Sequence, residues 1–262
     1  MTSGDFPRIT ELPELLIADS WIWERFESSI YSENFWIGLA PNNNRWLVKM
    51  RGSFYAYRER TFASLAQRLG LSCQSSVYLK LPQECLPRKG MEDTEDWQLA
   101  IWLLPEHGSQ ECSDHCPIEE LYRNINAPAQ DFVAALQASS VKNAVDWARG
   151  ELLAYLCGAN ESSDRLFTPD HQFVLIDNEQ IFSVPPGNIL EAPCLEAPNN
   201  GLSQAGLKVA LDLCSDFSAL ADDEIEEITR LPSHYTVDER WAIKPLIYEG
   251  RRAANEFLGL FG

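Results

Sequence analysis

The sequence contains a carboxylate that directly follows a short apolar run, an arrangement typical of metal sites. Residues 173–176 read FVLI and are followed at once by Asp177 and Asn178. Four consecutive apolar residues of this kind predict a buried strand. A buried strand that ends in a carboxylate is a common way to hold a metal ion, because magnesium and calcium prefer oxygen ligands. We therefore predict a metal-binding carboxylate at Asp177.

Polar residues precede this strand and belong to the same candidate site. Residues 160–164 read NESSD, residues 165–167 read RLF and residues 168–170 read TPD. The first stretch predicts a polar loop, and Thr-Pro-Asp is a turn signal that separates two short strands. The sequence thus predicts a loop, a strand, a turn and a buried strand, with Asp164 closing the loop.

A lysine and a glutamate ten residues apart form a second candidate pair. Residues 35–50, FWIGLAPNNNRWLVKM, predict a hairpin around a Pro-Asn-Asn-Asn turn, with Lys49 near the end of its second strand. A strand lysine is usually a solvent-exposed edge residue. Glu59 is expected in the first turn of the next helix, where the helix dipole favours a carboxylate. Glu59 could also reach back to Lys49 and hold its amine for a phosphate, so both interpretations stay open.

The elements that must position these residues follow from the apolar pattern. One helix is predicted to end at Gly70 and another at Gly158, because apolar residues recur on one face of each. These faces comprise Phe62, Leu65, Ala66 and Leu69 in the first helix and Val141, Val145, Ala148, Leu152 and Leu156 in the second. Residues 77–81 and 97–104 predict a further pair of strands. The predicted order is a small sheet with one helix, followed by a mainly helical part.

The last third of the chain is predicted to be helical. Apolar spacing indicates a helix over residues 203–212 and a short helix over residues 225–231. Thr236 followed by Glu239 predicts the capping box of a last helix. Pro245 is expected to kink or divide that helix, because proline removes a helical hydrogen bond.

Composition and charge limit the classes of function. The chain has 262 residues, 45% of them hydrophobic, and a formal net charge of −18. Such an acidic surface argues against binding of nucleic acid or of an anionic membrane. We find neither an apolar leader nor an apolar run long enough to span a membrane, and seven scattered cysteines suit reduced thiols. We therefore expect a cytoplasmic protein with a sizeable core.

Four potential zinc ligands lie close together in the middle of the chain. They are His107, Cys112, His115 and Cys116. The spacing differs from that of zinc fingers and ribbons, and adjacent ligands seldom converge on one tetrahedral ion. An ordinary polar connector is therefore the favoured interpretation.

Two segments resemble the HipA-like serine/threonine kinases, within the protein-kinase-like fold that also includes the phosphatidylinositol kinases. The segment LVKMRGSFYAYRERTFASLAQRLGL, residues 47–71, is similar to the strand lysine, glutamate-bearing helix and closing Leu-Gly-Leu of that family. The segment ANESSDRLFTPDHQFVLIDNEQIF, residues 159–182, is similar to its catalytic loop and Ile-Asp metal motif. The resemblance covers roughly residues 35–182.

The resemblance implies a role for each candidate residue and names two cofactors, ATP and Mg²⁺. Lys49 would contact the α and β phosphates of ATP, and Glu59 would orient that lysine. Asp177 would bind the Mg²⁺ ion that bridges the phosphates. The end of the strand before the linker, residues 101–104, would form the hinge that faces adenine, with Trp102, Leu103 and Leu104 as nucleotide contacts.

The catalytic loop can be aligned in two registers, and both remain open. In the family pattern a catalytic Asp lies five residues before a metal-binding Asn, which lies about thirteen residues before the metal-binding Asp. Asp164 precedes Asp177 by thirteen residues, so one register makes Asp164 a metal ligand and leaves Ala159, beside Asn160, at the position of the base. Transfer would then be crippled or would use Glu161. The protein would be pseudokinase-like.

The other register matches Asp164 and Arg165 to the Asp-Arg pair of the catalytic loop. Asp164 would then be the catalytic base of a contracted but working kinase. This register needs a loop about five residues shorter and places Pro169 where the Asn belongs. The pairing of residues 165–167 across the Pro169 turn favours the first register, whereas the motif wording favours the second.

Taken together, the sequence predicts one bilobal α+β domain of the protein-kinase-like kind. The amino-terminal lobe, with a small antiparallel sheet, would span residues 1–106, and the helical lobe residues 107–262. The resemblance implies an ATP-dependent transferase that phosphorylates a serine or threonine hydroxyl of a protein substrate. A pseudokinase that binds a nucleotide or a partner without turnover is the alternative, and a small-molecule phosphotransferase is a third class. The acceptor and the oligomeric state are left open.

Overall fold

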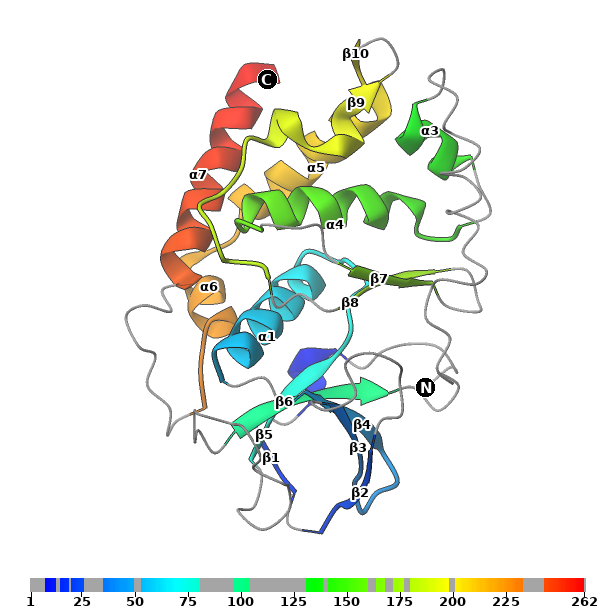
Figure 1. The fold of residues 1–262 in the computed structure, drawn as a ribbon. Helices are drawn as coiled ribbons and strands as arrows, with labels where there is room; N and C mark the ends of the chain where they lie inside the picture. Colours follow the sequence, from blue (N-terminus) through cyan, green and yellow to red (C-terminus); the bar gives the residue numbers. More distant parts are fainter. Residues whose placement is uncertain are drawn as a thin grey trace.

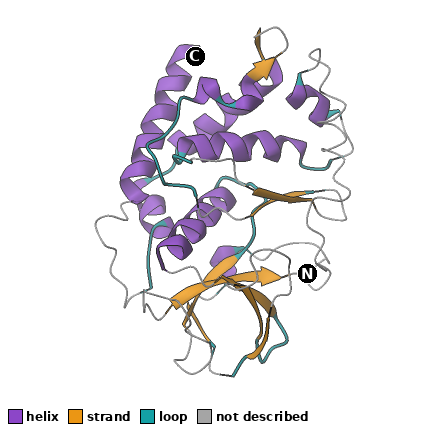
Figure 2. Cartoon of the chain, in the orientation of Figure 1, coloured by secondary structure: helices purple, strands orange, loops and turns teal. Residues whose placement is uncertain are grey.

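The chain has an α+β fold in which the sheet and the helices occupy different ends of the molecule (Figures 1 and 2). The computed structural model describes residues 8–12, 15–18, 20–25, 35–49, 53–80, 97–103, 131–138, 141–159, 164–167, 172–176, 180–197, 201–232 and 243–261. The strands of the first 103 residues form the sheet, at the bottom of Figure 1, and most helices come later in the chain. The α+β prediction is confirmed at this level.

The described part of the chain contains a six-stranded sheet with the order β1-β5-β6-β4-β3-β2. Its strands are β1 (Leu15–Ile17), β2 (Ile22–Arg25), β3 (Phe35–Leu39), β4 (Arg45–Lys49), β5 (Ser76–Lys80) and β6 (Trp97–Leu103). The predicted hairpin is β3–β4, with Phe35 opposite Lys49. The expectation of an antiparallel sheet is correct for five strands, whereas β1 pairs parallel to β5 at one edge. Strands β1 and β2 were not predicted.

Most of the described helices were predicted from the sequence, whereas α3 (Phe132–Gln137) was not. They are α1 (Ser53–Arg68), α3 (Phe132–Gln137), α4 (Ala144–Leu156), α5 (Gln204–Ser218), α6 (Asp222–Ile228) and α7 (Ile243–Phe261), with 3-10 turns η1 (Ile9–Glu11), η3 (Ile189–Glu191) and η4 (Pro193–Leu195). Ser203 caps α5 by accepting a hydrogen bond from the Gly206 N–H at 2.8 Å. Such a cap stabilises a helix by about 1 kcal/mol.

The last helix corrects one expectation. Helix α7 begins at Ile243, so Pro245 lies in its first turn, and the helix continues to Phe261. Proline is tolerated in the first turn because the N–H groups there have no partner within the helix. Thr236 and Glu239, the predicted capping box, lie outside the described residues.

Two two-stranded ribbons complete the described structure. Strands β7 (Asp164–Phe167) and β8 (Phe173–Ile176) pair antiparallel, as the Thr-Pro-Asp turn signal predicted. Strands β9 (Glu196–Ala197) and β10 (Gly201–Leu202) form a second, shorter ribbon. In Figure 1 the β7–β8 ribbon lies beside α4, between the helices and the sheet.

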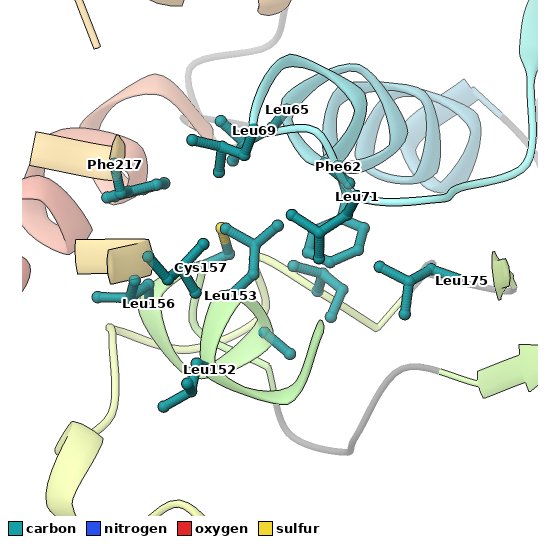
Figure 3. Close-up of a cluster of buried hydrophobic side chains, with 14 of the residues drawn as sticks. Phe62, Leu65, Leu69, Leu71, Leu152, Leu153, Leu156, Cys157, Leu175 and Phe217 are labelled. Atoms are coloured by element: carbon teal, nitrogen blue, oxygen red, sulfur yellow. The ribbon is translucent and has the colours of Figure 1, made fainter. Parts of the chain in front are cut away.

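The main hydrophobic core joins α1 to the helices that follow it. Figure 3 shows Phe62, Leu65 and Leu69 of α1 on the side of α4 that carries Leu153 and Leu156, with Phe217 of α5 beside them. All of these side chains are buried. A fully buried Leu or Phe contributes about 1.5 to 3 kcal/mol. A smaller core on the sheet contains Trp21, Trp46, Val48, Val77 and Leu79.

The main core does not stop at the predicted lobe boundary. It contains residues from both sides of residue 106, because α1 packs against α4. The boundary itself, between residues 106 and 107, lies outside the described residues. Among the described helices, none combines the length and the apolar content that crossing a membrane requires.

Candidate active site

A buried ion pair joins strand β4 to helix α1. The Lys49 Nζ lies 2.9 Å from Oε1 and 3.0 Å from Oε2 of Glu59, so the amine donates to both carboxylate oxygens. Lys49 is 6% exposed and Glu59 is 1% exposed. Removing one partner of a buried pair leaves an uncompensated charge and costs about 3 to 5 kcal/mol. The two side chains therefore hold each other in one arrangement.

The fold explains why this lysine is buried. Strand β4 lies inside the sheet, between β3 and β6, so Lys49 is not the solvent-exposed edge residue that a strand lysine usually is. Helix α1 begins at Ser53 and has no acidic residue in its first turn. Glu59 is thus in the second turn, and its expected position in the first turn was wrong. The helix dipole no longer accounts for Glu59, whereas the contact with Lys49 does.

The β7–β8 ribbon pairs the strand that begins at Asp164 with the strand that ends at Ile176. Asp164 pairs with Ile176, and Asp177 is the next residue of the chain. Antiparallel partners have Cα atoms about 4.5 to 5.5 Å apart, so the first residue of β7 lies beside the last residue of β8. The side chain of Asp164 and all of Asp177 lie outside the described residues. Their roles stay predictions.

The chain has a kinase-like fold. It superposes with a TM-score of 0.59 on the crystal structure of CtkA, a proinflammatory kinase of Helicobacter pylori, over 94% of this chain and 99% of that one. The two sequences are 10% identical, so the similarity concerns the fold. No family model and no curated protein sequence matches the chain.

Within this kinase-like fold, backbone hydrogen bonds join the two ends of the candidate catalytic segment. The N–H of Phe182 donates to the Cys157 carbonyl at 3.0 Å, and the N–H of Ser183 donates to the Gly158 carbonyl at 2.9 Å. Gly158 has φ +69°, and a Cβ there would overlap with the Val184 carbonyl oxygen. The residues before the polar loop and those after Asp177 are therefore held together.

Helix α1 also contacts the segment that follows Asp177. The Arg58 guanidinium donates to the Phe182 carbonyl at 3.0 Å and lies 3.9 Å from the centre of the Phe54 ring. Phe182 has φ 60°, which is rare for a residue with a side chain. Arg58 directly precedes Glu59. Neighbouring residues of α1 therefore contact both halves of the candidate site, which are Lys49 on the sheet and the segment that contains Asp177 and Phe182.

A third polar residue touches the ion pair. The Gln74 amide, on the segment between α1 and β5, donates to the Glu59 Oε1. Gln74 is 5% exposed, and its backbone N–H donates to the Leu175 carbonyl of β8 at 3.0 Å. Sequence reasoning missed Gln74, because a single glutamine in a short connector carries no periodic or motif signal. Its neighbour Cys73 is inert, because burial, and secondarily the charge of Glu59, raises the pKa of its thiol.

The structure describes only some of the residues that were predicted to contact a nucleotide or considered as zinc ligands. Trp102 and Leu103 belong to β6, opposite Trp46 and Arg45 of β4, while Leu104 lies outside the described residues. The nucleotide-binding role of this run stays a prediction. The cysteine and histidine cluster at residues 107–116 also lies outside them. Among the described side chains, no three acidic, histidine or cysteine groups gather to hold a metal ion.

Proposed function

We propose that the protein is a HipA-like, ATP-dependent kinase that transfers the γ-phosphoryl group to a serine or threonine hydroxyl of a protein in the cytoplasm. The observation that carries this proposal is the buried Lys49–Glu59 ion pair between β4 and α1. Phosphoryl transfer depends mainly on positioning and charge neutralisation, and a lysine fixed by a glutamate supplies a preorganised cation for phosphate oxygens.

The residues present fit a complex of Mg²⁺ and ATP. Lys49 is a buried cation with one fixed orientation, and the carboxylates of Asp164 and Asp177 are the oxygen ligands that Mg²⁺ prefers. When bound, Mg²⁺ neutralises the charge that develops on the phosphates. Lys49 would bind phosphate oxygens, Glu59 would orient the amine, and Asp177 would hold the metal. Backbone hydrogen bonds hold Cys157 and Gly158 beside Phe182 and Ser183.

The pairing of β7 with β8 favours a second candidate function, that of a pseudokinase. Asp164 belongs to β7 and pairs with Ile176, which matches the register in which Asp164 is a metal ligand. The position of the base then falls on Ala159, whose side chain cannot accept a proton. In this case the protein is a pseudokinase that binds the nucleotide without transfer.

Substitution of Asp164 by asparagine separates the two functions. We would incubate the purified protein with γ-labelled ATP and Mg²⁺ and measure both nucleotide binding and label transfer. Asparagine can replace a metal ligand but not a base. If Asp164 is the base, Asp164→Asn abolishes label transfer and keeps ATP binding. If Asp164 is a metal ligand, wild type already binds ATP without transfer, and Asp164→Asn keeps that binding. Asp164→Ala should lose label transfer but keep ATP binding if Asp164 is the base, and should weaken ATP binding in the presence of Mg²⁺ if Asp164 is a metal ligand. We expect Asp177→Ala and Lys49→Met to lower transfer about a hundredfold or more.

The outcomes are distinct. Label transfer that is lost in Asp177→Ala supports the kinase, and tight ATP binding without transfer supports the pseudokinase. A wild-type protein with no affinity for ATP in the presence of Mg²⁺ contradicts both.

A further inference from the structure

Gln74 connects the ion pair to the strand that leads into Asp177. Its side-chain amide donates to Glu59 Oε1, the same oxygen that lies 2.9 Å from the Lys49 amine. Its backbone N–H donates to the Leu175 carbonyl at 3.0 Å. Leu175 lies two residues before Asp177. One residue thus contacts both halves of the candidate site.

The backbone around Gln74 is fixed by several independent contacts. The N–H of Leu175 donates to the Ser72 carbonyl at 2.9 Å, and Cys73 forms a parallel bridge with Leu175. On the other side, the Gln67 amide of α1 donates to the Cys73 carbonyl at 3.2 Å and to Ser75 Oγ at 3.3 Å. This connector therefore has little freedom to move relative to either α1 or β8.

We propose that Gln74 is a positioning residue of the nucleotide site, which holds the Glu59 carboxylate against Lys49 and ties that arrangement to β8. The inference rests on the proposed function, because its consequence is nucleotide affinity. Gln74 acts through Glu59 and Lys49. Its hydrogen bond to Glu59 is therefore expected to strengthen the contact between the Lys49 amine and the phosphate oxygens of the nucleotide.

The chemistry at position 74 requires a neutral donor of this length. The amide Nε2–H donates to a carboxylate without adding charge. Methionine has a similar length and no donor, so Gln74→Met removes the hydrogen bond while filling the space. An ionised glutamate would place a second carboxylate against Glu59, whereas a protonated glutamate has an O–H donor and resembles the amide. These two variants therefore test the donor rather than the volume.

The experiment measures the dissociation constant for ATP with Mg²⁺ at pH 5.5 and pH 8, each value divided by that of wild type at the same pH. We expect Gln74→Met to weaken binding about tenfold at both pH values, as loss of a hydrogen bond to a charged group predicts. Gln74→Glu should weaken binding more than about tenfold at pH 8 and recover to within about threefold at pH 5.5, where the introduced carboxyl group is protonated.

Gln67→Met is the matched control. Gln67 has the same side chain and supports the same connector, and it bonds Cys73 and Ser75 rather than Glu59. We expect this variant to bind within about threefold of wild type at both pH values. The proposal is overturned if Gln74→Met binds like wild type. It is also overturned if Gln67→Met and Gln74→Met lose affinity equally, because Gln74 would then only support the connector.

A second readout needs no nucleotide. In Gln74→Glu, burial and the neighbouring Glu59 raise the pKa of the new carboxyl in the folded state, so this variant should gain unfolding free energy relative to wild type as pH falls from 7.5 to 5. Gln74→Met should follow the wild-type profile. If wild type binds no ATP, the proposed function fails while this profile still tests the contact with Glu59. Parallel profiles for all three proteins would refute the contact and with it the inference.

Discussion

Tyr57 links helix α1 to the chain that follows α6, through a hydrogen bond from its hydroxyl to the Thr229 carbonyl at 3.0 Å. Burial raises the pKa of Tyr57 from 10.0 to about 12. The folded state then holds this proton more tightly than the unfolded state does, so stability present below pH 10 is lost as pH rises towards 12. We expect Tyr57→Phe to cost about 1 kcal/mol at pH 8 and to lack this extra loss at high pH.

Urea unfolding of both proteins between pH 8 and pH 11.5 measures the effect. The gap in unfolding free energy between wild type and Tyr57→Phe should narrow above pH 10, since only wild type carries the tyrosine proton. Other groups that titrate at high pH are common to both proteins and cancel in the difference. A gap that stays constant over the whole range would show that Tyr57 titrates alike in the folded and unfolded states.

Residue types at the candidate site could be predicted, whereas their surroundings could not. Lys49 and Glu59 follow from the order of strand and helix, and the amine and carboxylate do meet. The burial of Lys49 depends on the pairing of β4 with β6, whose residues lie about fifty positions later in the chain. Gln74 and Tyr57 meet their partners only through the path of connectors, for which a single sequence has no periodic signal.

Two glycines with the same backbone conformation allow a matched test at the level of elements. Gly158 and Gly70 have φ +69° and φ +77°, and each follows the end of a helix. A Cβ at Gly70 would meet nothing within 4 Å, whereas a Cβ at Gly158 would overlap with the Val184 carbonyl oxygen. We expect Gly70→Ala to cost about 1 to 2 kcal/mol from backbone strain alone. Gly158→Ala should cost at least about 3 kcal/mol, because the segment of Val184 must also move.

Hydrogen exchange and chemical unfolding of the two variants separate these effects. In Gly158→Ala, the amides of Phe182 and Ser183 should exchange faster, since their acceptors lie at Cys157 and Gly158. In Gly70→Ala, the same amides should keep their protection relative to global unfolding. If both substitutions lower the unfolding free energy equally and neither changes local exchange, the close approach of Val184 to Gly158 makes no contribution to stability.

Elements with strong periodicity were predictable, and elements that depend on tertiary pairing were not. The faces of α1 and α4 and the β3–β4 and β7–β8 ribbons follow from local patterns and turn signals. Strands β1 and β2 have three and four residues, too few to show alternation, and they form through long-range pairing. Pro245 was misjudged because it lies in the first turn of α7 as the structure describes it, where proline is tolerated.

At the scale of the whole molecule, the sheet and the helices share one core although they occupy different ends. Helix α1 carries Glu59 on the side of the ion pair and Phe62, Leu65 and Leu69 in the main core. The kinase-like fold thus places α1 between the sheet and α4, where it contacts β5 and β6 on one side and the side chains of α4 on the other. Motion of one end relative to the other would have to disturb α1.

This shared core predicts that the sheet and the helices unfold together. Six of the eight tryptophans precede residue 103, so fluorescence reports on the sheet end, and far-ultraviolet circular dichroism reports on the helices. We expect both signals to give the same urea midpoint. Leu153→Ala, in α4, should lower the unfolding free energy by about 2 to 5 kcal/mol, because Leu153 faces α1 across the core. Both urea midpoints should fall by the same amount.

Val48→Ala, in the smaller core on the sheet, is the reciprocal variant. It should lower the dichroism midpoint as much as the fluorescence midpoint, since cooperative unfolding spreads a local loss over the whole unit. If Val48→Ala shifts only the fluorescence and Leu153→Ala shifts only the dichroism, the two ends unfold independently. Helix α1 would then not transmit stability between them, and the Lys49–Glu59 pair would have to be held by the sheet end alone.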